Sequence, residues 1–333
     1  MYIAALFCLI ALALAYLISK IVIHLLAQHL LDQPNHRSSH NIPTPRGGGI
    51  AIYSSLIISL GLFSFSTQFD ALLFLSVLIP ATAIFILGLC DDFLNLHVLP
   101  RLATQILISA IAIALNWPHE VTANGLHLLI ACIAILFLVA LVNFYNFMDG
   151  INGIAASEAI CACLGMGCIY WLTNNNQEDF YLLLILAGCS AGFLYWNFPT
   201  AKLFMGDSGS LLLGFILTLC ALRQLEKSPE LFISWLILLG GFIVDASLTL
   251  LVRIAHKQKF YLPHRTHAYQ KAADFLGSHT LATNSLIIIN IVWLFPLALA
   301  VSLDWLHAIA GLTLAYLPLT WIHIKLKGGR VTT

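Results

Sequence analysis

The sequence is poor in charged residues. Only 9% of its 333 residues are Asp, Glu, Lys or Arg, whereas 60% are hydrophobic. A soluble domain has about 25% charged residues, so this chain has too few polar side chains to cover the surface of a water-soluble globule. Its hydrophobicity also excludes disorder, which requires low hydrophobicity and high net charge. Basic and acidic residues balance to a net charge of zero, which argues against a nucleic-acid partner.

Long apolar runs make up most of the sequence. A bilayer core of about 30 Å requires a helix of about 20 apolar residues, and about 11 stretches meet this requirement. The runs are continuous, without the alternation of a β-barrel strand. We therefore predict an all-α, polytopic integral membrane protein that forms a single transmembrane domain over residues 1–333. The predicted spans are roughly 2–25, 48–66, 71–90, 102–117, 126–145, 153–173, 180–198, 208–223, 231–252, 284–302 and 305–324.

The basic residues predict the orientation of these spans. The first apolar run lacks the preceding positive residues of a signal peptide, so we expect a retained helix with a periplasmic N-terminus and a cytoplasmic C-terminus. Every Lys and Arg except Arg223 and Lys227 then lies on the cytoplasmic side, as the positive-inside rule requires. The predicted cytoplasmic loops are about 26–47, 91–101, 146–152, 199–207 and 253–283.

Residue types that are typical of active sites concentrate in these cytoplasmic loops, whereas the loops of the other side look like plain connectors. A transporter is expected to have polar groups near the bilayer midplane and at both mouths. An enzyme that acts on a cytosolic substrate needs only one face. The distribution therefore favours an enzyme, with a membrane transporter as the alternative.

Acidic residues mark two of the loops. Asp91 and Asp92 end the third span, where mutual repulsion and the helix dipole favour a positive partner such as a divalent cation; a solvated pair is the alternative. Asp149 lies with Asn146 and Asn152 in a glycine-broken segment. That segment offers either oxygen donors to a ligand or a plain turn.

The seventh loop ends in Gly-Asp-Ser-Gly-Ser, in which the acid is Asp207. Free N–H groups at a helix start suit a phosphate, and capping of the helix by Asp207 or Ser208 is the alternative. Asn197 and Lys202 precede this segment. The lysine adds a positive point charge that suits phosphate.

The ninth loop is basic and contains His264, Arg265 and His267. These residues suit an anion or a pyrophosphate, and a patch that touches anionic lipid is the alternative. Two acids, Glu158 and Asp245, fall inside predicted spans, where carboxylates are costly and often functional; structural hydrogen bonding is the alternative. Carboxylates and basic groups on one face suit Mg²⁺ together with a phosphorylated substrate.

Together these motifs resemble the polyprenyl-phosphate N-acetylhexosamine-1-phosphate transferases, glycosyltransferase family 4. Within the family, the motif sequences most resemble the branch that initiates O-antigen. The segments that carry this resemblance are Arg-Ser-Ser-His at 37–40, Pro-Arg-Gly-Gly-Gly at 45–49 and His-Arg-Thr-His-Ala-Tyr-Gln at 264–270. The similar segments follow the family's order and are residues 43–49, 91–92, 143–153, 197–209 and 264–267.

The resemblance implies an enzyme of the bacterial inner membrane. It would transfer N-acetylhexosamine 1-phosphate from a UDP-N-acetylhexosamine to undecaprenyl phosphate, and release UMP. Mg²⁺ is the implied cofactor, and Mn²⁺ can replace it. The polymer initiated is O-antigen or, alternatively, enterobacterial common antigen or teichoic acid. Some relatives form homodimers, which this sequence also allows.

The resemblance also implies residue roles. Asp207 and Asp92 would bind the metal, and Asp91, Asp92 and Asp149 would be catalytic. Many family members have a second aspartate where this chain has Asn152, so this position cannot act as a base here. The implied substrate-binding residues are Asn146, Asn152, Asn197, Lys202, His264, Arg265, His267, Arg46 and Arg101.

Overall fold

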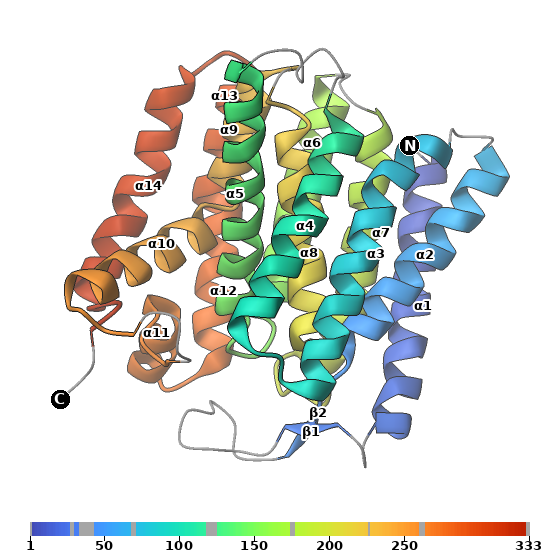
Figure 1. Ribbon diagram of the computed structural model, residues 1–333, viewed down its shortest axis with the longest axis horizontal. Helices are drawn as coiled ribbons and strands as arrows, with labels where there is room; N and C mark the ends of the chain where they lie inside the picture. The colour runs from blue at the N-terminus through green and yellow to red at the C-terminus, as the bar shows by residue number, and fades with distance from the viewer. Residues whose placement is uncertain are drawn as a thin grey trace.

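The computed structural model describes residues 2–26, 30–32, 43–67, 71–117, 125–173, 177–225, 227–259 and 264–330. The Arg-Ser-Ser-His segment at 37–40 lies outside the described residues. Helices pack side by side in one bundle (Figure 1), which confirms the predicted all-α membrane fold. Two short strands, β1 (Leu31–Asp32) and β2 (Thr44–Pro45), pair antiparallel below it.

The first half of the bundle contains α1 (Tyr2–Leu26), α2 (Gly48–Thr67), α3 (Ala71–Leu94), α4 (Val98–Asn116), α5 (Gly125–Met148), α6 (Ile154–Leu172) and α7 (Gln177–Asn197). The second half contains α8 (Gly206–Leu222), α9 (Pro229–Leu238), α10 (Gly240–Ala255), α11 (Ala268–Leu276) and α12 (His279–Ile289). It continues with the π-helix η2 (Asn290–Leu294), α13 (Phe295–Ser302) and α14 (Ala308–Lys325).

Among the described residues, eight helices are long and apolar enough to cross a membrane, and one bent pair brings the number to nine. The eight are α1 to α7 and the continuous run His279–Ser302. Helix α8, with 17 residues, and α14, with 18, are not among them. The predicted number of about 11 spans therefore remains a prediction, as does the orientation.

The predicted span 231–252 is a bent pair of helices in the structure. The chain bends by 72° between α9 and α10, beside Leu239. Gly240 and Gly241 follow the bend, and each glycine costs a helix about 1 kcal/mol relative to alanine. Hydropathy does not record such a break, because both arms are apolar. As a result Asp245 does not lie in the middle of a straight span but contacts the segment that leads into α11.

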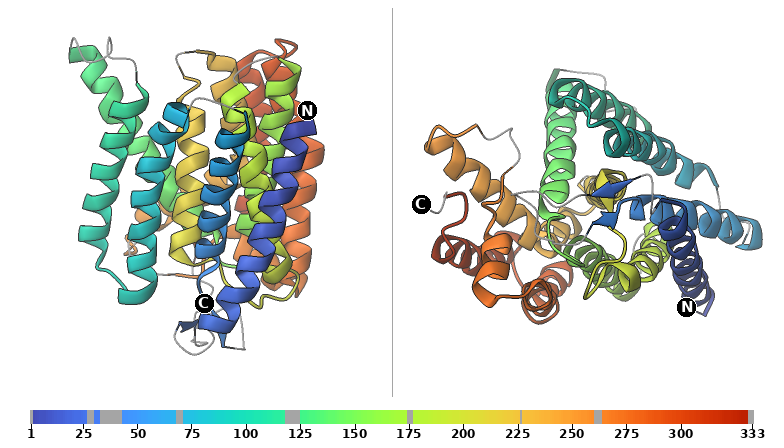
Figure 2. Two further views of the ribbon diagram at one scale, coloured as in Figure 1. Left: turned by 90° about the vertical axis from the view of Figure 1, so that its right-hand side faces the viewer. Right: turned by 90° about the horizontal axis from the view of Figure 1, so that it is seen from below.

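Helix α8 lies at the centre of the bundle. Its residues from Ser208 to Leu222 are all buried, and α2, α3, α5 and α6 pack around it (Figure 2). Between apolar helices in a bilayer, small residues permit close packing. A Cβ at Gly88 of α3 would lie 2.6 Å from the backbone of Asp207, and one at Gly214 would lie 2.7 Å from the Tyr145 Cβ. These glycines allow α3 and α5 to approach the central helix.

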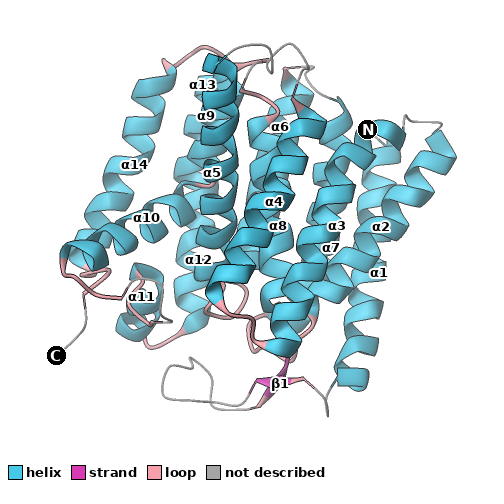
Figure 3. Ribbon diagram, viewed as in Figure 1, coloured by secondary structure: helices cyan, strands magenta, loops and turns pink. Residues whose placement is uncertain are grey.

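The connections that contain the predicted site residues meet at one end of the bundle. The α3–α4, α5–α6 and α7–α8 connections, together with α11, all lie at the lower end in Figures 1 and 3. Strands β1 and β2 lie at the same end. The motifs that the sequence places in separate loops therefore share one face of the molecule.

Candidate active site

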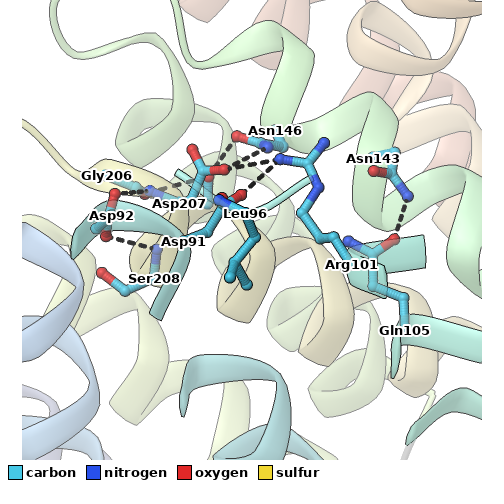
Figure 4. Close-up of polar contacts among 11 residues, drawn as sticks. Asp91, Asp92, Leu96, Arg101, Gln105, Asn143, Asn146, Gly206, Asp207 and Ser208 are labelled. Atoms are coloured by element: carbon cyan, nitrogen blue, oxygen red, sulfur yellow. Dashed lines mark hydrogen bonds and ion pairs between the residues drawn. The ribbon is translucent and has the colours of Figure 1, made fainter. Parts of the chain in front are cut away.

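Asp91 and Asp207 approach each other at the lower end of α3 and α8, and Arg101 of α4 joins them (Figure 4). The Arg101 Nη1 lies 2.7 Å from Asp91 Oδ2 and 3.2 Å from Asp207 Oδ2. A single guanidinium nitrogen thus contacts both carboxylates. Oxygens of the two acids are therefore close enough to share one cation.

Asp92 has a different environment from its neighbour. Its Oδ1 accepts a hydrogen bond from the backbone N–H of Asp207 (2.8 Å), and its Oδ2 accepts one from that of Ser208 (3.0 Å). The side chain is buried and caps the first turn of α8 from another helix. Gly206 has φ of +74°, and a Cβ there would lie 2.6 Å from Asp92 Oδ2. The helix start is therefore capped, but by Asp92 of α3 and not by Asp207 or Ser208.

Asn146 completes the polar cluster from α5. Its Nδ2 donates to Asp207 Oδ2 at 3.3 Å, and its Oδ1 accepts a hydrogen bond from the Ser210 hydroxyl at 2.8 Å. The hydroxyl fixes which end of the amide faces Asp207. Ser210 was not singled out from the sequence, although it stands in the Gly-Asp-Ser-Gly-Ser segment.

Asp149 lies half-buried in the turn between α5 and α6. Burial and, to a smaller extent, the charge of Asp92 raise the pKa of its carboxyl, the charge of Arg46 lowers it, and the resulting pKa is about 7. Asp149 therefore changes its charge near neutral pH. Arg46 itself forms an ion pair with Asp32 (3.0 Å), and its backbone pairs with Phe204.

Two predicted substrate-binding amides join the fifth and seventh loops. The Asn152 Nδ2 donates to the carbonyl of Pro199 at 3.0 Å. The buried Asn197 accepts from the Gly153 N–H and donates to the Leu203 carbonyl, both at 2.8 Å. These contacts hold the α5–α6 turn against the connection that leads to Asp207. Substrate contact by either amide stays a prediction.

The rings of His264 and His267 stack with centroids 5.0 Å apart. Burial, followed by the charges of His267 and Arg253, lowers the pKa of His264 to about 4 against the opposing charge of Asp245. His264 is therefore neutral at pH 7, with its Nδ1 3.0 Å from the Thr266 hydroxyl. It can exchange a hydrogen bond with a phosphate but does not add the positive charge that the sequence suggested.

The other predicted basic ligands have protein partners. Arg265 pairs with the exposed Asp274 of α11 at 2.6 Å. The ammonium of Lys202 is exposed and lies 5.6 Å from the centre of the Trp196 ring. Exposed contacts of this kind are weak, so both side chains can move to a substrate. Their predicted binding roles stay predictions.

Glu158 of α6 follows the structural alternative. It accepts a hydrogen bond of 2.6 Å from Asn290 Nδ2, at the start of the π-helix. A cavity of about 340 Å³ lies beside this pair and is lined by residues of α6, α7, α12, η2 and α13, with Ser157, Cys161 and Asn290 among them. Neither residue of this pair contacts the Asp91–Asp207 cluster in the described hydrogen bonds.

The cluster can hold a magnesium ion only together with other ligands. No group of three or more His, Cys, Asp or Glu side chains within the described ranges is arranged to hold a metal. Mg²⁺, however, typically takes one or two carboxylates and completes its shell with water and substrate phosphates. Asp91 and Asp207 fit this requirement. Asp92 fits it less well, because both of its oxygens already accept backbone N–H groups.

The fold and the site together define a multi-pass membrane protein with an acidic and basic cluster at one end of its bundle. Residues 74–224 match the model of glycosyl transferase family 4. This match agrees with the family resemblance that the motifs predicted. The match covers the helices that supply Asp91, Arg101, Asn146 and Asp207.

The names of similar proteins agree with this family match. A Bacillus subtilis protein named "Probable undecaprenyl-phosphate N-acetylglucosaminyl 1-phosphate transferase" is 28% identical over 79% of this chain and 75% of its own length. The Mycobacterium tuberculosis decaprenyl-phosphate N-acetylglucosaminephosphotransferase is 30% identical over 55% of this chain and 51% of its own length. The phospho-N-acetylmuramoyl-pentapeptide-transferase of Chlamydia trachomatis is 39% identical, but over only 38% of this chain and 37% of its own length.

Proposed function

We propose that this protein transfers N-acetylhexosamine 1-phosphate from a UDP-sugar to undecaprenyl phosphate, in the bacterial inner membrane. The products would be undecaprenyl diphosphate-linked sugar and UMP. The observation that supports this most directly is the cluster of Asp91, Arg101, Asn146 and Asp207 at one end of the bundle. It combines carboxylates for a metal with a cation for phosphate, where a lipid headgroup and a cytosolic nucleotide can meet.

The reaction is a phosphoryl transfer. An oxygen of the lipid phosphate forms a bond to the β-phosphorus of the UDP-sugar, and the bond from that phosphorus to the bridging oxygen breaks. UMP leaves with the bridging oxygen. A phosphate monoester is largely ionised at pH 7, so positioning and charge neutralisation matter more than removal of a proton.

The residues of the chain have distinct tasks in this proposal. Asp207 and Asp91 would hold Mg²⁺, which when bound neutralises charge on the diphosphate. Arg101 would move from the carboxylates to a phosphate oxygen of the lipid. Asp92 fixes the first turn of α8 and thereby the direction of the Asp207 side chain.

The polymer and the sugar are further parts of the proposal. The sequences of the motifs support initiation of O-antigen, and initiation of enterobacterial common antigen or teichoic acid is the alternative. The names of the Bacillus and Mycobacterium relatives favour N-acetylglucosamine as the first sugar to assay.

The test is UMP release by purified protein in detergent, with undecaprenyl phosphate, Mg²⁺ and a panel of UDP-N-acetylhexosamines. Asp207→Asn should abolish lipid-dependent UMP release. Asp304→Asn is the matched control, because Asp304 lies between α13 and α14 with φ of +57°, a conformation that asparagine also tolerates. Absence of UMP with every donor, from folded protein, would refute the proposal. Detergent also removes the two compartments that a transporter would need.

A further inference from the structure

We propose that Asp245 and the C-terminal residues 323–330 position the segment from His264 to Tyr269 against the turn that contains Asp149. These would be positioning residues of the UDP-sugar side of the site, and this assignment to the donor rests on the proposed function. The sequence marked Asp245 only as an acid inside a span and gave no partner for it.

Asp245, which lies on a different helix, α10, caps the start of α11. Its Oδ1 accepts a hydrogen bond from the N–H of Ala268 at 2.9 Å, and its Oδ2 accepts one from that of Tyr269 at 2.8 Å. The Thr249 hydroxyl donates to Oδ1 at 3.1 Å. Helix α11 has only nine residues, and so short a helix is not stable by itself. Its position therefore depends on contacts of this kind.

Two histidines from different elements face the same carboxylate. The Nδ1 of His267, at the start of α11, and the Nδ1 of His323, on α14, each lie 3.4 Å from Asp245 Oδ1. All three side chains are buried. A buried carboxylate requires partners of this kind, so α10, α11 and α14 are joined at one point.

The residues after α14 make a second connection to the same segment. The N–H of Gly329 donates to the carbonyl of Thr266 at 2.7 Å. The ammonium of Lys271 donates to the carbonyls of Lys327 and Arg330, both at 2.7 Å. The C-terminal residues thus contact both the loop that contains His264 and the helix that follows it.

Helix α11 in turn contacts the turn of Asp149. The Tyr269 hydroxyl donates to the carbonyl of Phe147 at 3.0 Å. A Cβ at Gly150 would collide with that hydroxyl, so glycine permits the close approach. A change at Asp245 or His323 should therefore move His264 and His267 relative to Asp149, although neither residue belongs to the Asp91–Asp207 cluster.

Hydrogen exchange on the full chain in detergent tests the positioning without any assumption about activity. In Asp245→Asn one of the two N–H groups loses its acceptor, and hydrogen bonds to charged groups are among the strongest. We expect amides of residues 264–272 to exchange about tenfold faster or more. Lys325→Ala is the matched control, because Lys325 is exposed on α14 two residues from His323; it should leave this exchange unchanged.

His323→Phe and Lys271→Ala provide the same test if Asp245→Asn does not fold. Each should speed exchange of residues 264–272 while the amides of α5 stay protected. Unchanged exchange in Asp245→Asn, or in both other variants when Asp245→Asn does not fold, would overturn the positioning role.

Kinetics then test the link to the donor. Asp245→Asn and His323→Phe should raise the KM for the UDP-sugar about tenfold and leave the KM for undecaprenyl phosphate unchanged. An effect on the lipid KM alone, or on kcat alone, would overturn the assignment to the donor. Inactive wild-type protein would instead refute the proposed function, while the exchange result would still decide the positioning.

Discussion

Replacement of Asp92 by asparagine separates a capping role from a metal-ligand role. Asparagine has the same shape but only one acceptor oxygen. It can satisfy one of the two N–H groups of Asp207 and Ser208, and its own NH₂ group would face the other. An unsatisfied buried N–H costs about 1–3 kcal/mol. Asp92 is only 6% exposed, so water cannot replace the lost acceptor.

We therefore expect Asp92→Asn to lower the midpoint of thermal unfolding in detergent and to lower kcat for UMP release. The loss of activity should persist at any Mg²⁺ concentration, because the direction of Asp207 has changed rather than the charge at the metal. Asp304→Asn serves again as the control for an Asp-to-Asn exchange.

The opposite result would refute this reasoning. If Asp92 were a metal ligand, Asp92→Asn would leave the stability near that of the wild type. Its activity would then recover as the Mg²⁺ concentration rises.

Three further changes test other parts of the site. Arg101→Lys should retain more UMP release than Arg101→Ala but less than wild type, since a lysine retains the positive charge but not the shape of the guanidinium; equal activity of the two variants would contradict the proposed role of this charge. Asp149 has a raised pKa of about 7, against about 3.9 in an unfolded chain, so its ionisation destabilises the fold as pH rises from about 4 to about 7. Asp149→Asn should therefore raise the unfolding midpoint at pH 8, relative to wild type, but not at pH 4, while activity falls; equal midpoints at pH 8 would count against the buried charge. Gly150→Ala should lower activity about tenfold or more by displacing Tyr269, whereas Gly125→Ala, whose Cβ would meet nothing within 4 Å, should be neutral in the same assay.

The sequence predicts the all-α membrane fold because long apolar runs have few alternatives in a bilayer. It also predicts that Asp91, Asn146 and Asp207 meet, because their loops all fall on one side when the spans alternate. It does not predict the bend beside Leu239, since the chain is apolar on both sides of it.

The sequence also does not predict which group each polar side chain contacts. Asp91 and Asp92 are adjacent and chemically identical, yet one contacts Arg101 and the other caps α8. Which carboxylate faces which partner depends on the rotation of α3 against α8, and no local pattern encodes it. The same holds for Asn197, whose amide contacts backbone groups although its residue type equally suits a ligand.

The most direct test of the central claim follows the phosphorus atom itself. A UDP-N-acetylhexosamine with radioactive phosphorus at the β position is incubated with the purified protein, undecaprenyl phosphate and Mg²⁺. Sugar-phosphate transfer predicts that the label enters the lipid fraction and that unlabelled UMP is released in equal amount. Label that remains with the nucleotide as UDP, while the sugar enters the lipid, would contradict the account.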